Sequence, residues 1–320
     1  MAEAAIDRRV RRANSVRSAL RTALPGIALA CMLAVIFWIQ PTAMSYFGIM
    51  LLFKLAVPLL FAALAQMLII MLGDIDLSNG ALVGLVTCIS AVYLQAAPLA
   101  AIVGYLSVVL AYTAFGTLIQ WQKLPSIIVT LGMSFVWLGM AIVVLPAPGG
   151  QAPQWLIDFM SWRPPLVPLP VWFAVGLALV GHLVITRSSL GVILRAAGAN
   201  PRAVERAGWS VGAIRIGTYT AAALLLCCAG LTLTGLTTSG DPNVAPAYTL
   251  LGIGAVILGG GSFAGGDVSP IGTIIGALTL SLAGSLLSFL QVPPTWQIGA
   301  QGVILFLVLA GRVLLSEQKS

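Results

Sequence analysis

The sequence predicts an all-α polytopic membrane protein with about ten transmembrane helices, some of them discontinuous. Hydrophobic residues make up 59% of the 320 residues and charged residues only 8%. Several apolar runs approach the roughly 20 residues that a helix needs to cross a bilayer. The cations also follow the predicted topology, because all but two of the 16 Lys and Arg fall on one side of the membrane. Since that side is normally the cytoplasm, we expect both termini to be cytoplasmic.

The chain begins with a basic arm at residues 1–23, which contains six arginines. No small-residue cleavage site follows the first apolar run, so we expect an uncleaved first span and a cytoplasmic arm. Residues 24–312 form one predicted transmembrane domain, and residues 313–320 form a cytoplasmic tail. The third and eighth spans are short, which predicts that they are tilted, broken or shielded by neighbouring helices. The predicted spans are 24–40, 47–72, 80–97, 99–119, 126–145, 169–186, 214–238, 246–260, 270–290 and 296–312.

Composition and motifs exclude several classes of function. The net charge of +7 does not indicate a nucleic-acid partner, because the cations are distributed by membrane side and form no binding face. The four cysteines lie inside apolar runs without CxxC or Cys/His spacing, so neither disulfides nor a metal site is predicted. The sequence has no HExxH pair, GxSxG turn or GxxxxGK[ST] phosphate loop. We therefore expect no catalytic residue, no cofactor and no ATPase site in this chain.

The largest predicted outer loop, Pro146–Pro170, is rich in proline and contains Trp155 and Trp162. Its central QWLIDFMSW predicts a short amphipathic helix that lies on the bilayer surface. Such a helix suits contact with lipid or docking of an external partner.

A first break in the apolar pattern is GDIDLSNG, residues Gly73–Gly80. Carboxylates beside a membrane core must face water, a cavity or a helix end. In one interpretation, Asp76 and Ser78 cap the next span by accepting its free N–H groups. In the other, a discontinuous helix lines the path of a polar substrate. The second interpretation places Asp74, Asp76, Ser78 and Asn79 along that path.

A second break, Gly259–Asp267, interrupts a later apolar run with glycine, which permits unusual dihedral angles and close backbone approach. Both breaks fall toward the cytoplasmic side of the predicted topology. We expect Gly260, Gly261 and Ser262 to line the same path.

The segment 187–215 separates the two halves of the domain and carries five arginines. It contains a short predicted helix with Asn200 as N-cap, Pro201 in the first helical position and Gly208 as the left-handed stop. The segment is either an ordinary solvated connection or a docking element, and the capped helix favours docking. The exposed face of this helix consists of Arg202, Glu205 and Arg206.

Four stretches resemble the permease subunits of ABC importers for ribose, galactose and xylose, and they occur in the family's order. GDIDLSNGALVGL, from Gly73, resembles the GGIDLS signature, and RAAGANPRAVERAGWSV, from Arg195, resembles the cytoplasmic loop. LPSIIVTLG, which contains Thr130, resembles the PxFIVTLG segment and adds Thr130 to the expected path. GGGSFAGG, from Gly259, followed by PIGT resembles the glycine-rich segment. Asp74 stands where the family usually has glycine.

The resemblance implies a permease subunit in the bacterial inner membrane that pairs with a second permease, either a copy of itself or a related chain. It also implies two cytoplasmic ATPase subunits and a periplasmic binding protein that delivers a monosaccharide or similar neutral polyol. The 200–208 helix would then be the coupling helix, through which the ATPase dimer switches the spans between outward and inward openings.

A proton-coupled secondary transporter, with Asp74 or Asp76 as the coupling acid, is the alternative function. Against it, the spans contain few other ionisable groups to relay protons. An intramembrane enzyme is disfavoured by the missing catalytic motifs.

Overall fold

The structure, a computed structural model, describes residues 25–293 together with 296, 299–300, 302–303 and 306. The predicted basic arm, most of the tenth span and the C-terminal tail lie outside the described residues. The described part is helical, with one isolated bridge between Gly149 and Gly240, which confirms the all-α prediction there. Its elements are a helix at Pro25–Ile39, η1 (Pro41–Met44), α2 (Tyr46–Lys54), α3 (Ala56–Met71), α4 (Asn79–Tyr93), α5 (Pro98–Gln122), α6 (Ser126–Val144), α7 (Gln154–Ser161), α8 (Leu169–Gly181), η2 (His182–Arg187), α9 (Ser189–Ala199), α10 (Pro201–Arg206), α11 (Val211–Thr237), α12 (Ala247–Leu258) and α13 (Pro270–Phe289).

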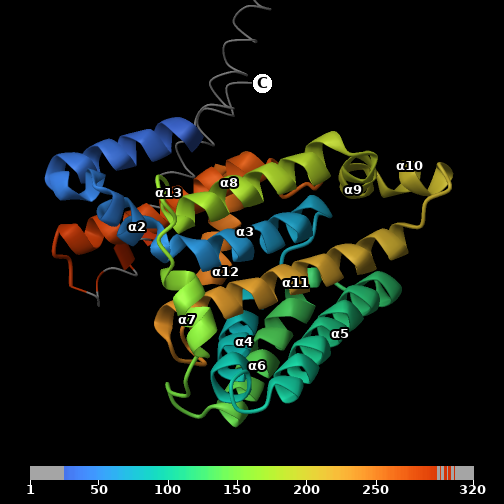
Figure 1. Cartoon of the computed structure of the whole chain (residues 1–320). Helices are drawn as coiled ribbons and strands as arrows, with labels where there is room; N and C mark the ends of the chain where they lie inside the picture. Colours follow the sequence, from blue (N-terminus) through green and yellow to red (C-terminus); the bar gives the residue numbers. More distant parts are fainter. Residues whose placement is uncertain (1–24, 294–295, 297–298, 301, 304–305, 307–320) are drawn as a thin grey trace, which may run out of the picture.

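Helix α3 lies at the centre of the molecule (Figure 1). Every residue of this helix is buried, and it packs against α8, α11, α12 and α13. Its sequence is apolar on all sides apart from Gln66, as expected for a helix enclosed by other helices. The 27-residue α11 packs against α3 and also against α4 and α5. In Figure 1, α8 and α13 lie on one side of this pair, and α4, α5 and α6 lie on the other.

The number of membrane spans differs from the prediction. Within the described residues, five helices are long and apolar enough to cross a membrane, or six if the bent pair α2 and α3 counts as one span. Helices occupy the first nine predicted segments, but about ten full spans are not confirmed. At 1.5 Å per residue, the 15 residues of α4 and the 12 of α12 rise about 22 and 18 Å, short of the roughly 30 Å hydrocarbon core.

The two short helices end at the glycine-rich breaks that the sequence predicts. GDIDLSNG delays the start of α4, and GGGSFAGG follows the end of α12. Most of the side chains of α4 are buried, so neighbouring helices shield it from lipid. Non-helical backbone at membrane depth is tolerated when it is buried in protein in this way.

The predicted second span, 47–72, is bent by 45° between α2 and α3. Pro58 accounts for the position of the bend. Its ring clashes with the carbonyl four residues earlier and its nitrogen donates no hydrogen bond. That carbonyl belongs to Lys54, the last residue of α2.

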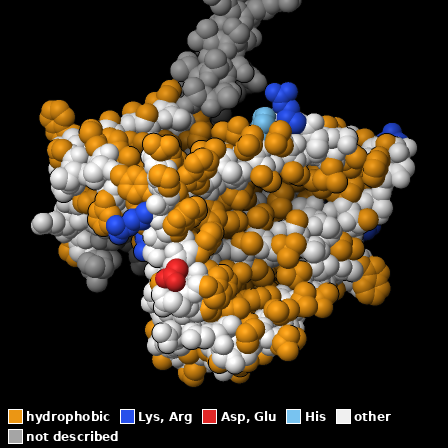
Figure 2. All heavy atoms as spheres, viewed as in Figure 1, with side chains coloured by type: hydrophobic (Ala, Val, Ile, Leu, Met, Phe, Trp, Pro, Cys, Tyr) orange, Lys and Arg blue, Asp and Glu red, His pale blue; other side chains and the backbone are white. Residues whose placement is uncertain are grey.

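Hydrophobic side chains cover most of the face shown in Figure 2, and charged ones are few. Most residues of α5 and α6 are exposed in the isolated chain, among them large apolar ones such as Leu110, Phe135 and Val143. Exposed apolar surface on this scale marks contact with a membrane or with another chain.

The predicted amphipathic helix of the outer loop is present as α7. Leu156 and Met160 of α7 are buried against Gly235 of α11. The two helices pack closely there, because a Cβ on Gly235 would lie 2.7 Å from Met160 Cγ and 2.9 Å from Leu156 Cγ. Trp155 and Phe159 remain exposed. The helix is therefore fixed to the protein by one face and presents aromatic side chains on the other.

Candidate functional site

The break between α3 and α4 spans residues 72–78 and has irregular backbone. Two of its N–H groups are satisfied by hydroxyl side chains of α6, and three more donate to backbone carbonyls at the end of α3. Ser126 Oγ on α6 accepts from Ile75 N at 3.1 Å, and Thr130 Oγ1, one turn further along α6, accepts from Leu77 N at 3.0 Å. The break is thus held as a defined structure, because each buried N–H needs a partner.

Asp76 is buried, with 1% of its surface exposed. Its Oδ1 accepts hydrogen bonds from Ser78 N and Ser78 Oγ, both at 2.7 Å, and its Oδ2 accepts from the Tyr112 hydroxyl on α5. Three donors therefore surround this carboxylate, which offsets much of the free energy of burying it.

The expectation that Asp76 and Ser78 cap α4 is wrong in its details. The Ser78 side chain makes no capping bond to the helix, because its hydroxyl donates to Asp76 instead. Asp76 closes a turn ahead of the helix by accepting from Ser78 N. The backbone N–H of Gly80, near the start of α4, donates to Thr249 Oγ1 of α12 at 2.9 Å. A tertiary contact has replaced the local cap.

Asp74 is paired with a cation and a tyrosine of α11. Arg215 Nε lies 3.6 Å from Asp74 Oδ2, and the Tyr219 hydroxyl donates to the same oxygen at 3.2 Å. Arg215 and Tyr219 are four residues apart, so they share one face of α11. The acid that departs from the family pattern is therefore compensated within this chain.

The rings of Tyr112 and Tyr219 lie against each other, with centroids 5.7 Å apart. Gly116, one turn after Tyr112 on α5, makes room for them, since a Cβ there would lie 2.7 Å from the Tyr219 ring. We call Asp74, Asp76, Tyr112, Tyr219 and Arg215 the acid–tyrosine cluster. It joins the first break to α5 and α11.

Asn79 and Gln66 form a buried polar pair beside the cluster. Asn79 Nδ2 donates to Ala62 O at 3.1 Å and to Gln66 Oε1 at 3.3 Å. Asn79 Oδ1 and Thr273 Oγ1 are buried without a hydrogen-bond partner among the described residues. Buried polar atoms are usually satisfied, so these two can receive hydrogen bonds from a solute or water.

The second break meets the first through backbone contacts. Gly266 N donates to Met71 O at 2.8 Å, and a Cβ on Gly265 would lie 3.0 Å from Gly73 N. Gly265 and Gly266 have φ angles of 81° and 80°, which favour glycine. Of the predicted path residues in this break, Gly260 has a φ of 107°, and a Cβ added there would meet no atom within 4 Å.

Helix α9 completes this junction. A Cβ on Gly198 would lie only 1.8 Å from Met71 O and 2.8 Å from Gly266 N, so α9 approaches both breaks at contact distance. We call Gly73, Gly198, Gly265 and Gly266 the glycine junction. The sequence predicts the two breaks separately, and the structure brings them together at the end of α9.

The helix predicted at 200–208 is present as α10, with the predicted caps. Asn200 Oδ1 accepts from Ala203 N at 3.2 Å, Pro201 occupies the first helical position, and Gly208 has a φ of 87°. Val204 is buried. Arg202, Glu205 and Arg206 are exposed, as expected. Figure 1 shows α10 at the edge of the molecule, where α9 leads into it and α11 follows.

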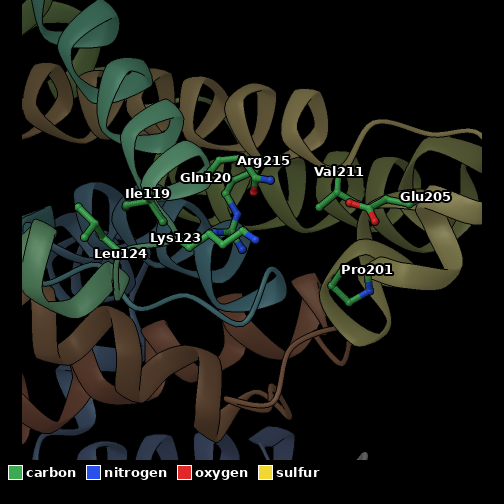
Figure 3. A pocket seen from close by; sticks show the side chains of 8 residues that line it. All are labelled: Ile119, Gln120, Lys123, Leu124, Pro201, Glu205, Val211 and Arg215. Carbon is green, nitrogen blue, oxygen red and sulfur yellow. The ribbon is translucent and has the colours of Figure 1, made fainter.

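A cleft of about 310 Å³ lies between the end of α5, α10 and the start of α11. Figure 3 shows Lys123, Gln120 and Arg215 toward one side of this cleft, with Glu205 and Pro201 toward the other. Over the described part of the chain, no three His, Cys, Asp or Glu side chains lie close enough to hold a metal ion.

Sequence reasoning missed Tyr112, Tyr219 and Thr249 as partners of the first break. It noted Arg215 only as one cation of the 187–215 segment. The spacing of Arg215 and Tyr219 on α11 was the available signal, since a cation and a hydroxyl on one helix face suit a carboxylate.

Apolar helices that are interrupted by glycine-rich breaks, with buried polar groups at the breaks, define a multi-pass membrane protein of the permease class. Residues 48–309 match the family described as the permease component of the branched-chain amino acid transport system. The chain belongs to this family.

Among its relatives, the ribose import permease protein of Escherichia coli (strain K12) is 28% identical over 291 residues, covering 88% of this chain and 90% of the relative. The autoinducer 2 import system permease protein of Salmonella choleraesuis is 25% identical over 309 residues, covering 94% and 88%. The ribose import permease protein of Bacillus subtilis is 28% identical over 264 residues, covering 81% of each chain. These relatives confirm the resemblance drawn from the four sequence stretches. No solved structure matches the chain.

Proposed function

We propose that this chain is the membrane subunit of an ATP-driven ABC importer in the bacterial inner membrane. It forms the translocation path for a monosaccharide or a similar neutral polyol. The family match and the relatives named as ribose import permeases support this function. Two cytoplasmic ATPase subunits, a periplasmic binding protein and a second permease copy complete the transporter, and ATP is bound by the ATPase subunits.

The glycine junction is the observation that carries the proposal. Gly198 of α9 touches Met71, the residue directly before the first break, and Gly266 of the second break, and α9 runs directly into α10. An ATPase that moves α10 therefore moves α9 against both breaks at once. Close-packed interfaces shift between discrete arrangements and do not deform continuously, so this contact suits a two-state switch between inward and outward openings.

The polar groups near the breaks favour an uncharged solute. Asp74 is paired with Arg215, and Asp76 is surrounded by hydroxyl and N–H donors. Of the buried polar atoms without a hydrogen bond among the described residues, Asn79 Oδ1, Thr273 Oγ1 and Trp137 Nε1 are neutral, and Arg215 Nε belongs to the ion pair with Asp74. An ion in transit would need a countercharge at membrane depth, whereas a sugar hydroxyl needs only such neutral partners. With so few of them, affinity and identity reside mainly in the binding protein.

The test is uptake by proteoliposomes that contain the permease and its cognate ATPase. A panel of labelled pentoses and hexoses is added with the cognate binding protein, with and without ATP. We expect uptake that requires both ATP and the binding protein. Uptake by the permease alone, driven by a proton gradient and abolished by Asp74→Asn or Asp76→Asn, would refute the proposal in favour of a secondary transporter.

A further inference from the structure

The cleft beside α10 has charges that its own residues leave without an opposite partner. Lys123 lies at the end of α5 and Glu205 on α10, and both line the cleft. Among the described residues, the one ion pair is that of Arg215 with Asp74. The cleft thus presents cations toward one side and a carboxylate toward the other (Figure 3).

The backbone of Lys123 is unusual for a lysine. It ends α5 in the left-handed conformation, with φ 52° and ψ 36°. Glycine or asparagine normally occupies this position after a helix, because a Cβ strains it. A lysine here keeps the strain and places its ammonium group at the cleft, which suggests a use for the charge.

Arg215 faces two directions. Its Nε approaches Asp74 at 3.6 Å, and its side chain also lines the cleft. A guanidinium has four further N–H donors on its two terminal nitrogens, so it can bind a second carboxylate while it contacts Asp74. Lys123 and Arg215 together form a binding position for an acidic group.

We propose that this cleft receives an acidic side chain of the ATPase subunit, bound between Lys123 and Arg215, with a hydrogen-bond donor of the same subunit opposite Glu205. The inference rests on the proposed function and adds a second docking point beside the exposed face of α10. Glu205 distinguishes a protein partner from a phosphate or an anionic lipid headgroup. A small anion gains nothing from a carboxylate across the cleft, whereas a protein surface can present opposite charges to both sides.

The acidic side chain of the ATPase and Asp74 both bind the guanidinium of Arg215. Docking of the acid at the terminal nitrogens of Arg215 divides its positive charge between two carboxylates, which weakens the charged contact between the first break and α11. The ATPase therefore acts on the acid–tyrosine cluster through Arg215 as well as on the glycine junction through α9.

Lys123→Gly tests the proposal without confounding strain, because glycine suits the left-handed backbone and removes only the side chain. The wild-type permease in nanodiscs of zwitterionic lipid is titrated with its cognate ATPase, at several salt concentrations. We expect Lys123→Gly to weaken binding about tenfold and to flatten its salt dependence, while Lys123→Arg keeps both. Arg187→Gln, an exposed cation outside the cleft, is the matched control and should bind like wild type.

Equal affinity and equal salt dependence of Lys123→Gly and wild type would overturn the proposal. So would a loss that occurs only in nanodiscs containing anionic lipid, which would assign the cleft to a headgroup. If the wild-type permease itself does not bind the ATPase, the proposed function is refuted. If wild type and Lys123→Gly bind the ATPase equally well, only the role of the cleft is refuted.

Discussion

Gly198→Ala tests whether the glycine junction connects α9 to the two breaks. The added Cβ would lie 1.8 Å from Met71 O and 2.8 Å from Gly266 N. Both are backbone atoms that cannot rotate away, and they form the hydrogen bond that joins the second break to the end of α3, directly before the first break. Overpacking costs about 1 to 3 kcal/mol and an unmade buried hydrogen bond about 1 to 3 kcal/mol. The higher helix propensity of alanine offsets about 1 kcal/mol of this loss of stability.

The net expectation is a loss of about 3 kcal/mol, the middle of these ranges. In a domain of this size each kcal/mol lowers the melting temperature by about 2 to 4 °C, so the midpoint should fall by about 6 to 12 °C. The assay is thermal unfolding of the purified permease in detergent, combined with sugar uptake and ATP hydrolysis by the reconstituted complex. We expect uptake to fall more than hydrolysis, because α10 is intact but no longer moves the breaks.

Gly217→Ala is the matched control, because Gly217 lies on α11 and a Cβ there meets no atom within 4 Å. This variant should be as stable as wild type or up to about 1 kcal/mol more stable. If Gly198→Ala melts and transports like Gly217→Ala, then α9 does not contact the breaks closely and the proposed route from α10 is wrong.

Three further sets of substitutions test other parts of the site. Asp74→Gly introduces the residue usual in the family and should destabilise the permease by about 1 to 3 kcal/mol, because it leaves Arg215 and the Tyr219 hydroxyl without their partner. Arg215→Gln should restore part of that loss in a thermal double-mutant cycle, and additive effects would show that the pair is not coupled. Asp76→Asn should retain assembly and uptake. Asp76→Leu should lower the yield of folded protein, because it leaves the three hydrogen-bond donors around this side chain unpaired, at about 1 to 3 kcal/mol each. Equal yields of the two variants would contradict the hydrogen-bonding role of Asp76. Gly208→Val should lower the amount of sugar taken up per ATP hydrolysed severalfold, because a β-branched residue does not fit a φ of 87°. An unchanged ratio of uptake to hydrolysis would show that this turn has no role in coupling.

The sequence predicted the helices well wherever the signal was local. Apolar runs located the first nine helical segments, and Asn200, Pro201 and Gly208 located α10 with its caps. The QWLIDFMSW segment likewise predicted α7. Each of these depends on residues within one or two turns of each other, where spacing and capping chemistry decide the outcome.

The tertiary partners could not be predicted in the same way. Asp74 and Tyr219 are 145 positions apart, and nothing local to either indicates the other. Ser78 has a good capping side chain, yet Asp76 takes its hydroxyl and Thr249 of another helix takes the nearby N–H. The number of full spans also differed, although the sequence already indicates that the third and eighth predicted spans, which form α4 and α12, are short and adjoin the two breaks.

The complete enclosure of α3 has a consequence for biosynthesis. This helix packs against α11, α12 and α13, and the last of these follows it by roughly 200 residues, which takes a ribosome about 10 to 40 s to synthesise. During that interval an apolar segment with Gln66 at its middle must wait in lipid or beside an insertase, without its final neighbours. Gln66 finds its first partner early, because Asn79 lies only 13 positions further along the chain. Nascent chains arrested before α11 should therefore keep α3 accessible to lipid-phase crosslinkers, and chains extended beyond α13 should protect it.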